Sequence, residues 1–179
     1  MGITFEPTKL SGAFVIKPER FDDERGSLLR AFSASEFEEH GITPATAECN
    51  ISFSKRRYTV RGMHFQRGLH AQAKLVRCTR GAVFDVIIDL RPESPTYKQW
   101  IAEELTEENR HLLYVPEGFA HGFQTLVDNA ELFYQMSKIY APGSEGGVRW
   151  NDPVFGIPWP ERKDVIINDR DRNYPDFRD

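Results

Sequence analysis

Short apolar runs with alternating polar residues recur along most of the chain, and turn residues separate them. Alternation of period two, bounded by glycine, proline, asparagine or aspartate, is typical of strands that bury one face. The pattern therefore predicts an all-β sandwich or barrel. The expected strands cover residues 13–16, 27–32, 50–54, 60–66, 73–79, 82–90, 99–105, 111–115, 121–126, 130–139 and 147–150.

Helical signals are few and short. Ser33 and Glu36 resemble the two ends of a capping box, and Phe37 is expected to face inward. Gly41 is placed to end this helix, because glycine readily adopts the left-handed conformation of a C-terminal cap. Residues 106–109 predict one further helical turn at a strand junction.

The charged C-terminal stretch, residues 161–179, resembles a disordered tail in composition. Its apolar residues argue otherwise, because residues 165–167, Tyr174 and Phe177 are side chains that a barrel can bury. Neither an internal repeat nor a linker interrupts the chain. With 179 residues, the sequence predicts a single domain, 1–179, with a full core.

Composition and charge restrict the kinds of partner. The formal net charge of −4 argues against nucleic acid, whose phosphates recruit basic surfaces. Cys49 and Cys78 are too few for a disulfide scaffold or a zinc knuckle and are expected to be reduced, buried thiols. Residues 1–10 lack the pattern of a signal peptide, and no stretch approaches the roughly 20 apolar residues of a membrane span. These features predict a cytoplasmic protein without a membrane partner.

Two segments place a histidine beside glycine within β-like runs. One covers residues 61–66 and contains His64, with Lys74 shortly after it; the other covers residues 116–123 and contains His121. Glycine allows a ligand or a second backbone to approach closely, and imidazole exchanges protons near neutral pH. Either histidine alone could be a structural, hydrogen-bonded residue. Together with Lys74, the two segments predict a reaction pocket inside the barrel.

Strand alternation gives these side chains a direction. Lys74 and Tyr134 alternate with apolar neighbours and are candidates to point into the barrel, although an edge lysine and a plain packing tyrosine are the alternatives. Over residues 60–66, the two expected faces are Gly62, His64 and Gln66 on one side and Arg61, Met63 and Phe65 on the other.

A metal site is the main competing interpretation of two histidines in a small β-barrel. Metallocupins usually supply a second histidine two positions after the first, and then a carboxylate. Here Gln66 holds that position after His64, no carboxylate follows at short spacing, and Lys74 would repel a cation. Catalytic metal sites use about three protein ligands, so no bound catalytic metal is expected.

Two arginines suggest an anionic ligand. Arg25 and Arg61 each precede a glycine in a chain of acidic balance. Guanidinium groups bind phosphate oxygens in a bidentate way, so a diphosphate is a fitting ligand. The alternative is that either arginine simply lies on the surface.

Several segments, in order, closely resemble the dTDP-4-dehydrorhamnose 3,5-epimerase family, and the resemblance runs from about residue 14 to residue 171. The segments are 23–26 (DERG), 60–66 (VRGMHFQ), 71–77 (AQAKLVR), 83–91 (VFDVIIDLR), 94–96 (SPT), 116–123 (PEGFAHGF), 150–153 (WNDP) and 156–160 (GIPWP). The resemblance implies a cupin-type jelly-roll barrel (a double-stranded β-helix), a homodimer, and no metal or organic cofactor. It also implies a nucleotide-diphosphate 4-keto-6-deoxyhexose as substrate.

The resemblance also assigns catalytic roles. His64 matches the general base, and Asp171 matches the residue that orients it. Lys74 would stabilise the oxyanion at C4, and Tyr134 would return a proton from the opposite face of the sugar. The family's substrate-contacting positions fall on Arg25, Asn50, Arg61, His121, Glu145 and Arg170, with Arg25 acting across a dimer interface.

Two residues depart from the family pattern in the region that holds the nucleotide. Arg30 stands where glutamate is common, and Glu48 stands where glutamine is common. Glutamine donates and accepts hydrogen bonds, whereas glutamate only accepts. We hypothesise that Arg30 and Glu48 pair with each other and that the base or sugar preference differs; ordinary drift at tolerant positions is the alternative.

The sequence leaves three other functions open. The first is a mono-epimerase that inverts only C3 or C5 of a related sugar, since His64 and Tyr134 serve either outcome. The second is a metal-dependent cupin enzyme, which Gln66 and Lys74 disfavour. The third is a sugar-binding module without catalysis, which would not need the acid–base residues.

Overall fold

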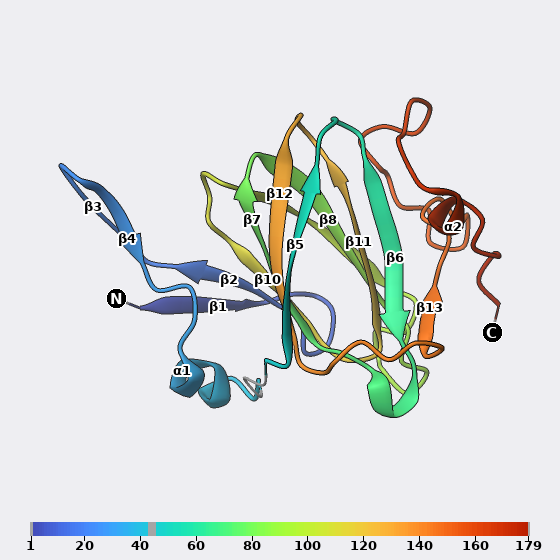
Figure 1. Cartoon of the computed structure of the whole chain (residues 1–179). Helices are drawn as coiled ribbons and strands as arrows, with labels where there is room; N and C mark the ends of the chain where they lie inside the picture. Colours follow the sequence, from blue (N-terminus) through green and yellow to red (C-terminus); the bar gives the residue numbers. More distant parts are fainter. Residues whose placement is uncertain (1, 43–45, 179) are drawn as a thin grey trace.

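The computed structural model describes residues 2–42 and 46–178, and most of its strands form two sheets (Figure 1). The first sheet contains β1 (Ile3–Pro7), β2 (Phe14–Pro18), β5 (Glu48–Ser54), β7 (Lys74–Arg80), β10 (Leu112–Val115) and β12 (Ala130–Met136). The second contains β6 (Val60–Gln66), β8 (Ala82–Asp89), β9 (Trp100–Thr106), β11 (Phe119–Thr125) and β13 (Glu145–Gly147). A hairpin and three short helical elements complete the described part: β3 (Arg20–Asp23), β4 (Gly26–Leu29), α1 (Ala34–Glu39), η1 (Gly68–His70) and α2 (Asp169–Arg172).

The strand orders are those of an antiparallel barrel. The six-stranded sheet runs β1-β2-β10-β7-β12-β5, and the five-stranded sheet runs β13-β6-β11-β8-β9. The main core lies between the two sheets, because buried side chains of both pack together there; examples are Val76, Leu113 and Leu132 from the first sheet with Ile87 and Phe123 from the second. The prediction of an all-β barrel with a few short helices is confirmed.

The C-terminal segment covers the outer face of the five-stranded sheet. Met63 and Ile88 on that face are fully buried against a cluster that includes Trp159. Val165 and Phe177 pack on the same cluster, so the charged tail docks as predicted. Buried apolar surface contributes roughly 25 cal/mol per Å², which favours the docked state.

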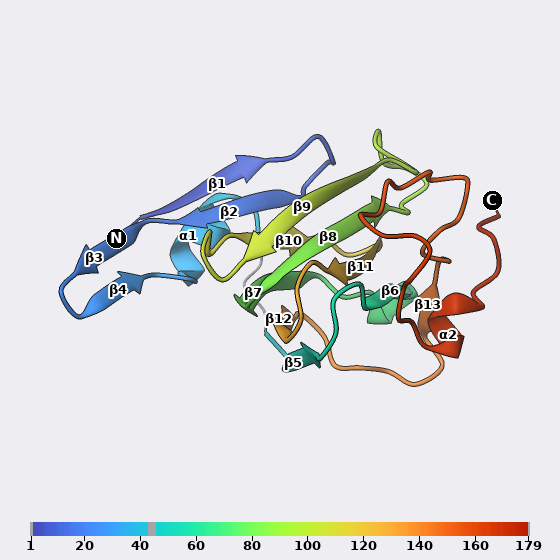
Figure 2. The same cartoon turned by 90° about the horizontal axis from the view of Figure 1, so that it is seen from above.

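The outer face of the six-stranded sheet is covered only in part. α1 places Phe37 against Leu75 and Leu112 on one half of this face. On the other half, Ile51 is 68% exposed and Phe53 is 40% exposed. The hairpin β3–β4 projects away from the barrel (Figures 1 and 2). Among residues 2–42 and 46–178, little packs on this hairpin or on the exposed half of the sheet face.

α1 begins and ends near the predicted positions, but its first turn is stabilised differently. Ser33 is the N-cap residue, yet its side chain makes no capping hydrogen bond, so the capping-box prediction is wrong. The carboxylate of Glu36 instead accepts the backbone N–H of Ile3 at 3.1 Å, which ties the helix to β1. Gly41 has φ +72°, as the predicted C-terminal cap requires.

Other differences follow from weak local signals. β1, β3 and α2 were not predicted, since β3 is fully exposed and α2 is a single turn. The helical turn after β9 is present, because Arg110 N–H donates to the carbonyl of Thr106 at 3.2 Å. Cys78 is buried as expected, whereas Cys49 is exposed because it lies on the outer face of edge strand β5. Within the described ranges, no helix is long and apolar enough to cross a membrane.

Candidate active site

A β-bulge in β6 shapes the site. His64 pairs with His121 and Arg61 pairs with Phe123, so β6 uses one more residue than β11 between these pairs. Gly62 lies in the bulge with φ +121°, and a Cβ there would come within 2.5 Å of the Gly122 Cα. The glycines therefore let two backbones approach closely. The sequence suggested that glycine admits either a ligand or a second backbone, and here it admits a second backbone.

The bulge also changes which side chains share a face. Strict alternation placed Arg61 opposite His64, and this prediction is wrong, because the extra residue turns Arg61 onto the His64 side. Arg61 is held there by Ser54, whose Oγ accepts from Nε at 3.2 Å, and by the carbonyl of Phe53, which accepts from the guanidinium at 3.1 Å. Met63 stays on the outer face, fully buried.

A cavity of about 160 Å³ collects most of the predicted site residues between the two sheets. Lys74 and Tyr134 come from the six-stranded sheet, and His64 and His121 come from the five-stranded sheet. The lining residues are Ser52, Arg61, His64, Lys74, His121, Gly122, Phe123, Tyr134, Asn168 and Asp171. All four predicted catalytic residues therefore meet in one cavity.

His64 and Asp171 form the predicted dyad. Nε2 of His64 lies 2.7 Å from Oδ1 of Asp171, and the other carboxylate oxygen accepts the Gly62 N–H at 3.0 Å. Burial raises the pKa of Asp171, but the hydrogen bonds from His64 and Gly62 outweigh it, so the pKa lies below its ordinary value. The ionised carboxylate places the imidazole proton on Nε2 and leaves Nδ1 as the basic nitrogen.

The backbone holds Asp171 in place from the other side. Asn168 caps α2 by accepting the N–H of Asp171 at 2.7 Å, and the carboxylate side chain is 1% exposed. The segment before α2 is fixed to β6, because Val60 N–H donates to the Ile166 carbonyl at 2.8 Å. The docked tail thus carries the residue that orients His64.

His121 has a carboxylate partner that the sequence analysis did not single out. Its Nε2 lies 2.9 and 3.0 Å from the two carboxylate oxygens of Asp85, which is fully buried. The available signal was one acidic residue inside the apolar run of β8, since a buried charge needs a partner. His121 is therefore a buried, oriented imidazole facing the cavity.

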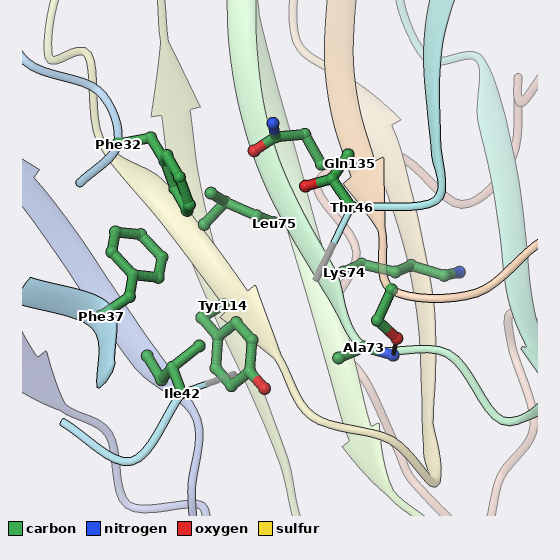
Figure 3. A pocket seen from close by; sticks show the side chains of 10 residues that line it. Phe32, Phe37, Ile42, Thr46, Ala73, Lys74, Leu75, Tyr114 and Gln135 are labelled. Carbon is green, nitrogen blue, oxygen red and sulfur yellow. Dashed lines mark hydrogen bonds between the residues drawn. The ribbon is translucent and has the colours of Figure 1, made fainter. Parts of the chain in front are cut away.

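Lys74 points into the barrel and is not an edge residue, because β7 lies between β10 and β12. Burial lowers the pKa of Lys74 to about 8, although the charge of Asp85 acts in the opposite direction. A small apolar cavity of about 30 Å³ adjoins the backbone of Lys74, and Figure 3 shows the side chain leading away from Phe32 and Phe37. The ammonium group is thus directed away from the apolar pocket.

Three of the predicted substrate contacts lie near the cavity without lining it. Asn50 pairs with Tyr134 on the neighbouring strand and so shares its face. Glu145 accepts the Tyr140 hydroxyl at 3.0 Å, and Arg170 donates from Nε to the Tyr174 hydroxyl at 2.9 Å. Glu145 and Arg170 also interact electrostatically, and these two residues form an outer polar group next to the dyad residue Asp171.

The other three predicted contacts lie elsewhere in the chain. Arg25 pairs with Asp23 on the projecting hairpin, and its side chain is 86% exposed. Arg30 pairs with Glu36 at 3.2 Å. Glu48 instead accepts the backbone N–H of Tyr140 at 3.0 Å, so the hypothesised Arg30–Glu48 ion pair is wrong.

The fold and this cavity together define a cupin-type jelly-roll enzyme with an acid–base site. Among the described residues, no group of three or more His, Cys, Asp or Glu side chains is arranged to hold a metal ion. The family model for dTDP-4-dehydrorhamnose 3,5-epimerase matches residues 7–179. The chain belongs to this epimerase family, so the predicted family, jelly-roll fold and isomerase class are confirmed.

Individual relatives agree over nearly the whole chain. The dTDP-4-dehydrorhamnose 3,5-epimerase of Salmonella typhimurium is 46% identical over 86% of this chain and 84% of its own. The Bacillus anthracis epimerase structure with TDP and PPi bound has a TM-score of 0.95 at 38% identity, and it covers 98% of this chain and 100% of its own.

Two further structures carry sugar ligands. The Legionella pneumophila epimerase in complex with dTDP-4-keto-L-rhamnose has a TM-score of 0.89 at 36% identity, with 95% of this chain and 90% of that chain covered. ChmJ, a 3'-monoepimerase from Streptomyces bikiniensis in complex with dTDP-quinovose, has a TM-score of 0.88 at 34% identity, with 95% and 86% covered. The shared fold therefore accommodates single as well as double inversion.

Proposed function

We propose that this chain, as a single domain of residues 1–179, inverts C3 and C5 of dTDP-4-dehydro-6-deoxy-D-glucose to give dTDP-4-dehydro-L-rhamnose. The observation that carries the proposal is the cavity in which the His64–Asp171 dyad faces Lys74 and Tyr134. The relatives that bind dTDP-linked sugars support the substrate class. A cytoplasmic location, expected from the sequence, is part of the same proposal.

The chemistry follows from the C4 ketone of the substrate, which acidifies the protons on C3 and C5. Nδ1 of His64 takes a proton, the C–H electron pair forms a C=C bond, and the carbonyl π electrons move onto O4. The Lys74 ammonium group stabilises the negative oxygen. Tyr134, from the opposite sheet, donates a proton to the other face of the carbon, and the O4 electrons re-form the ketone.

The remaining residues supply binding. Arg61 and His121 line the cavity, and we assign them to the diphosphate and sugar, respectively. Asn50, Glu145 and Arg170 extend the polar surface beside it. No step in this scheme requires a metal or an organic cofactor.

The proposal includes a homodimer in which Arg25 binds the substrate of the partner subunit. Within one chain, Arg25 does not line the cavity and lies in the turn between β3 and β4. Figure 1 shows that this hairpin projects from the barrel. Phe21 and Leu28 on the hairpin are 45% and 62% exposed, and Ile51 on the uncovered sheet face is 68% exposed. Exposed apolar surface of this kind marks association sites.

Mixing two inactive variants tests the shared site. Arg25→Ala and His64→Ala homodimers are both expected to be nearly inactive with substrate below KM. Unfolding and refolding them together should restore about a quarter of the wild-type activity, because half the dimers are mixed and each has one intact site. Light scattering should show a dimer. A monomer, or no recovery on mixing, would contradict the shared-site arrangement.

Deuterium exchange tests the reaction and the carrier preference. In heavy water, the protein is expected to introduce deuterium at C3 and C5 of 4-keto-6-deoxyglucose carried on dTDP, and the absence of exchange on dTDP, UDP, CDP and GDP carriers would refute the proposed function. Exchange at only one carbon would instead establish a mono-epimerase.

The same carrier series tests the effect of Glu48. A carboxylate only accepts hydrogen bonds, so it fits the ring N–H of thymine or uracil and not the bare ring nitrogen of cytosine. The UDP sugar is therefore expected to react within about tenfold of the dTDP sugar, and the CDP sugar should be poorer still. Glu48→Gln is expected to reduce the difference in rate between the dTDP sugar and the CDP sugar, because the glutamine amide can also donate a hydrogen bond to cytosine. Full turnover of dTDP sugar alone would contradict the altered preference while supporting the epimerase.

A further inference from the structure

Tyr174 lies against the catalytic base from the docked tail. Its ring centroid is 6.3 Å from that of His64, with the planes at 69°, an edge-to-face arrangement. Asp171 holds His64 through Nε2, and Tyr174 adds a second contact to the ring. None of the acid–base steps uses Tyr174, so its position needs a separate explanation.

Gly147 makes room for this ring. It pairs with His64 across the β13–β6 ladder, and a Cβ at Gly147 would lie 2.1 to 2.5 Å from three ring atoms of Tyr174. Real Cβ atoms do not approach aromatic carbons so closely, so any side chain at position 147 would displace the ring. The three atoms nearest to that Cβ all belong to Tyr174, so the absence of a side chain at position 147 makes room for this ring.

The hydroxyl of Tyr174 makes the second connection. It accepts from Nε of Arg170 at 2.9 Å, and Arg170 is one of the proposed substrate contacts. This hydrogen bond raises the pKa of Arg170, so the guanidinium stays charged. One side chain thus contacts both the base and an arginine of the outer polar group.

The tail on either side of Tyr174 is fixed to the barrel. Before it, Ile166 exchanges backbone hydrogen bonds with Tyr58 and Val60. After it, Phe177 N–H donates to the Asp152 carboxylate at 2.6 Å, and Asp176 pairs with Arg149. The ring is therefore presented by a segment anchored at both ends, and Figure 2 shows α2 beside β13 and β6.

We propose that Tyr174, whose ring packs over Gly147, is a positioning residue. It fixes the His64 imidazole and the Arg170 guanidinium relative to each other, so that both can contact the same substrate molecule. The inference rests on the proposed function. Misplacement of a catalytic group by about 1 Å can cost up to a hundredfold in rate, so a second contact on the His64 ring has a measurable effect.

Three variants separate the two contacts. Tyr174→Phe keeps the ring and loses the bond to Arg170, so KM is expected to rise about fivefold with kcat within about twofold of wild type. Tyr174→Ala removes both contacts, and kcat is expected to fall by about tenfold or more. Gly147→Ala displaces the ring while Tyr174 stays in the sequence, so it should lower kcat as Tyr174→Ala does.

The double variant Gly147→Ala with Tyr174→Ala provides the sharpest outcome. Once the ring is absent, the three closest contacts of a methyl group at position 147 are gone, so the double variant should be no slower than Tyr174→Ala alone. If the losses in kcat of the two single variants add up in the double variant, Gly147 acts independently of Tyr174. That result would overturn the proposal that Gly147 makes room for the Tyr174 ring. If Gly147→Ala fails to fold, as judged by thermal melting, the two Tyr174 variants still decide the question.

Phe177→Leu is the matched control, because it weakens tail docking without changing the ring beside His64. It is expected to lower the melting temperature and to leave kcat within about twofold of wild type. An equal loss of kcat in Phe177→Leu and Tyr174→Ala would assign the effect to tail docking and overturn the proposal, as would wild-type kcat in Tyr174→Ala. Failure of the wild-type chain to exchange substrate protons would instead refute the proposed function.

Discussion

Replacing His64 by alanine is expected to reduce solvent exchange at C3 and C5 of the substrate by a thousandfold or more. A positioned general base contributes about 10² to 10⁴ in rate, and His64, oriented by Asp171 in the cavity, is the residue assigned to this role. The measurement is deuterium incorporation under single-turnover conditions, followed at both carbons. Exchange within about tenfold of wild type would remove His64 as the base.

Asp171→Asn tests the orientation of His64 by the same exchange measurement and should have a smaller effect than His64→Ala. The carboxylate accepts from two donors, His64 Nε2–H and Gly62 N–H, with one oxygen for each. An amide has one oxygen only, so one donor would face an NH₂ group. The variant should therefore lose about ten- to a hundredfold in exchange and also some stability.

Tyr134→Phe is the control that separates deprotonation from inversion. The base remains intact in this variant, so protons should still wash out, but the donor on the opposite face is missing. Deuterium should then return mainly from the His64 side with retention of configuration. If Tyr134→Phe loses as much exchange as His64→Ala, then His64 and Tyr134 do not act separately on the two faces of the sugar carbon.

Much of the barrel was predictable because the pattern of apolar residues along a strand reports which of its faces are buried. β8 is the clearest case, since Val83 and Ile87 face the main core while Val86 and Ile88 face the tail cluster. A strand buried on both faces reads as a continuous apolar run, and its boundaries were predicted nearly to the residue. By contrast, β3 is exposed along its whole length, so no burial pattern marked it.

The site residues were predictable where their side-chain chemistry is specific. They were less predictable where backbone geometry decides the direction of a side chain. His64, Lys74, Tyr134 and Asp171 were all expected, and all line one cavity. Arg61 was placed on the wrong face because one extra residue in β6 reverses the alternation, and a bulge has no strong signal in a single sequence.

Partners distant in the chain were the other difficulty. Asp85 was visible as a charge in an apolar strand, but only the β8–β11 pairing shows that it meets His121. Arg30 and Glu48 have complementary charges, yet each has a different partner, because α1 lies beside one and residue 140 beside the other. Charge complementarity alone does not establish contact.

Lys74→Met is expected to lower kcat by about 10² to 10³, because removal of one preorganised donor to a developing oxyanion typically has that effect. The substitution keeps the length of the side chain and removes its charge. Deprotonation of the substrate would then generate an enolate without a cation beside O4. A kcat within about tenfold of wild type would exclude Lys74 as the stabilising group, whereas Lys74→Arg should recover part of the rate.

The pH dependence provides an independent test of the same lysine. Burial lowers the pKa of Lys74 to about 8 from 10.5, and the reaction uses the protonated form, so kcat should fall as the pH rises above about 8. In Lys74→Arg this alkaline limb should disappear, because guanidinium stays charged. A limb near pH 8 that persists in Lys74→Arg would belong to another group.

The contribution of Lys74 to the stability of the fold should change in the opposite direction over this pH range. Between about pH 8 and 10.5, the unfolded chain holds a proton on Lys74 that the folded chain has released, so the contribution of this group to the free energy of unfolding increases with pH. Below pH 8, the folded state carries a buried ammonium group at a cost, and Lys74→Met should raise the melting temperature at pH 7. A fall in activity between about pH 7 and 9 without a fall in melting temperature over the same range cannot be ascribed to denaturation. A Lys74→Met variant that is both slower and more stable would show that the barrel retains a destabilising charge for catalysis.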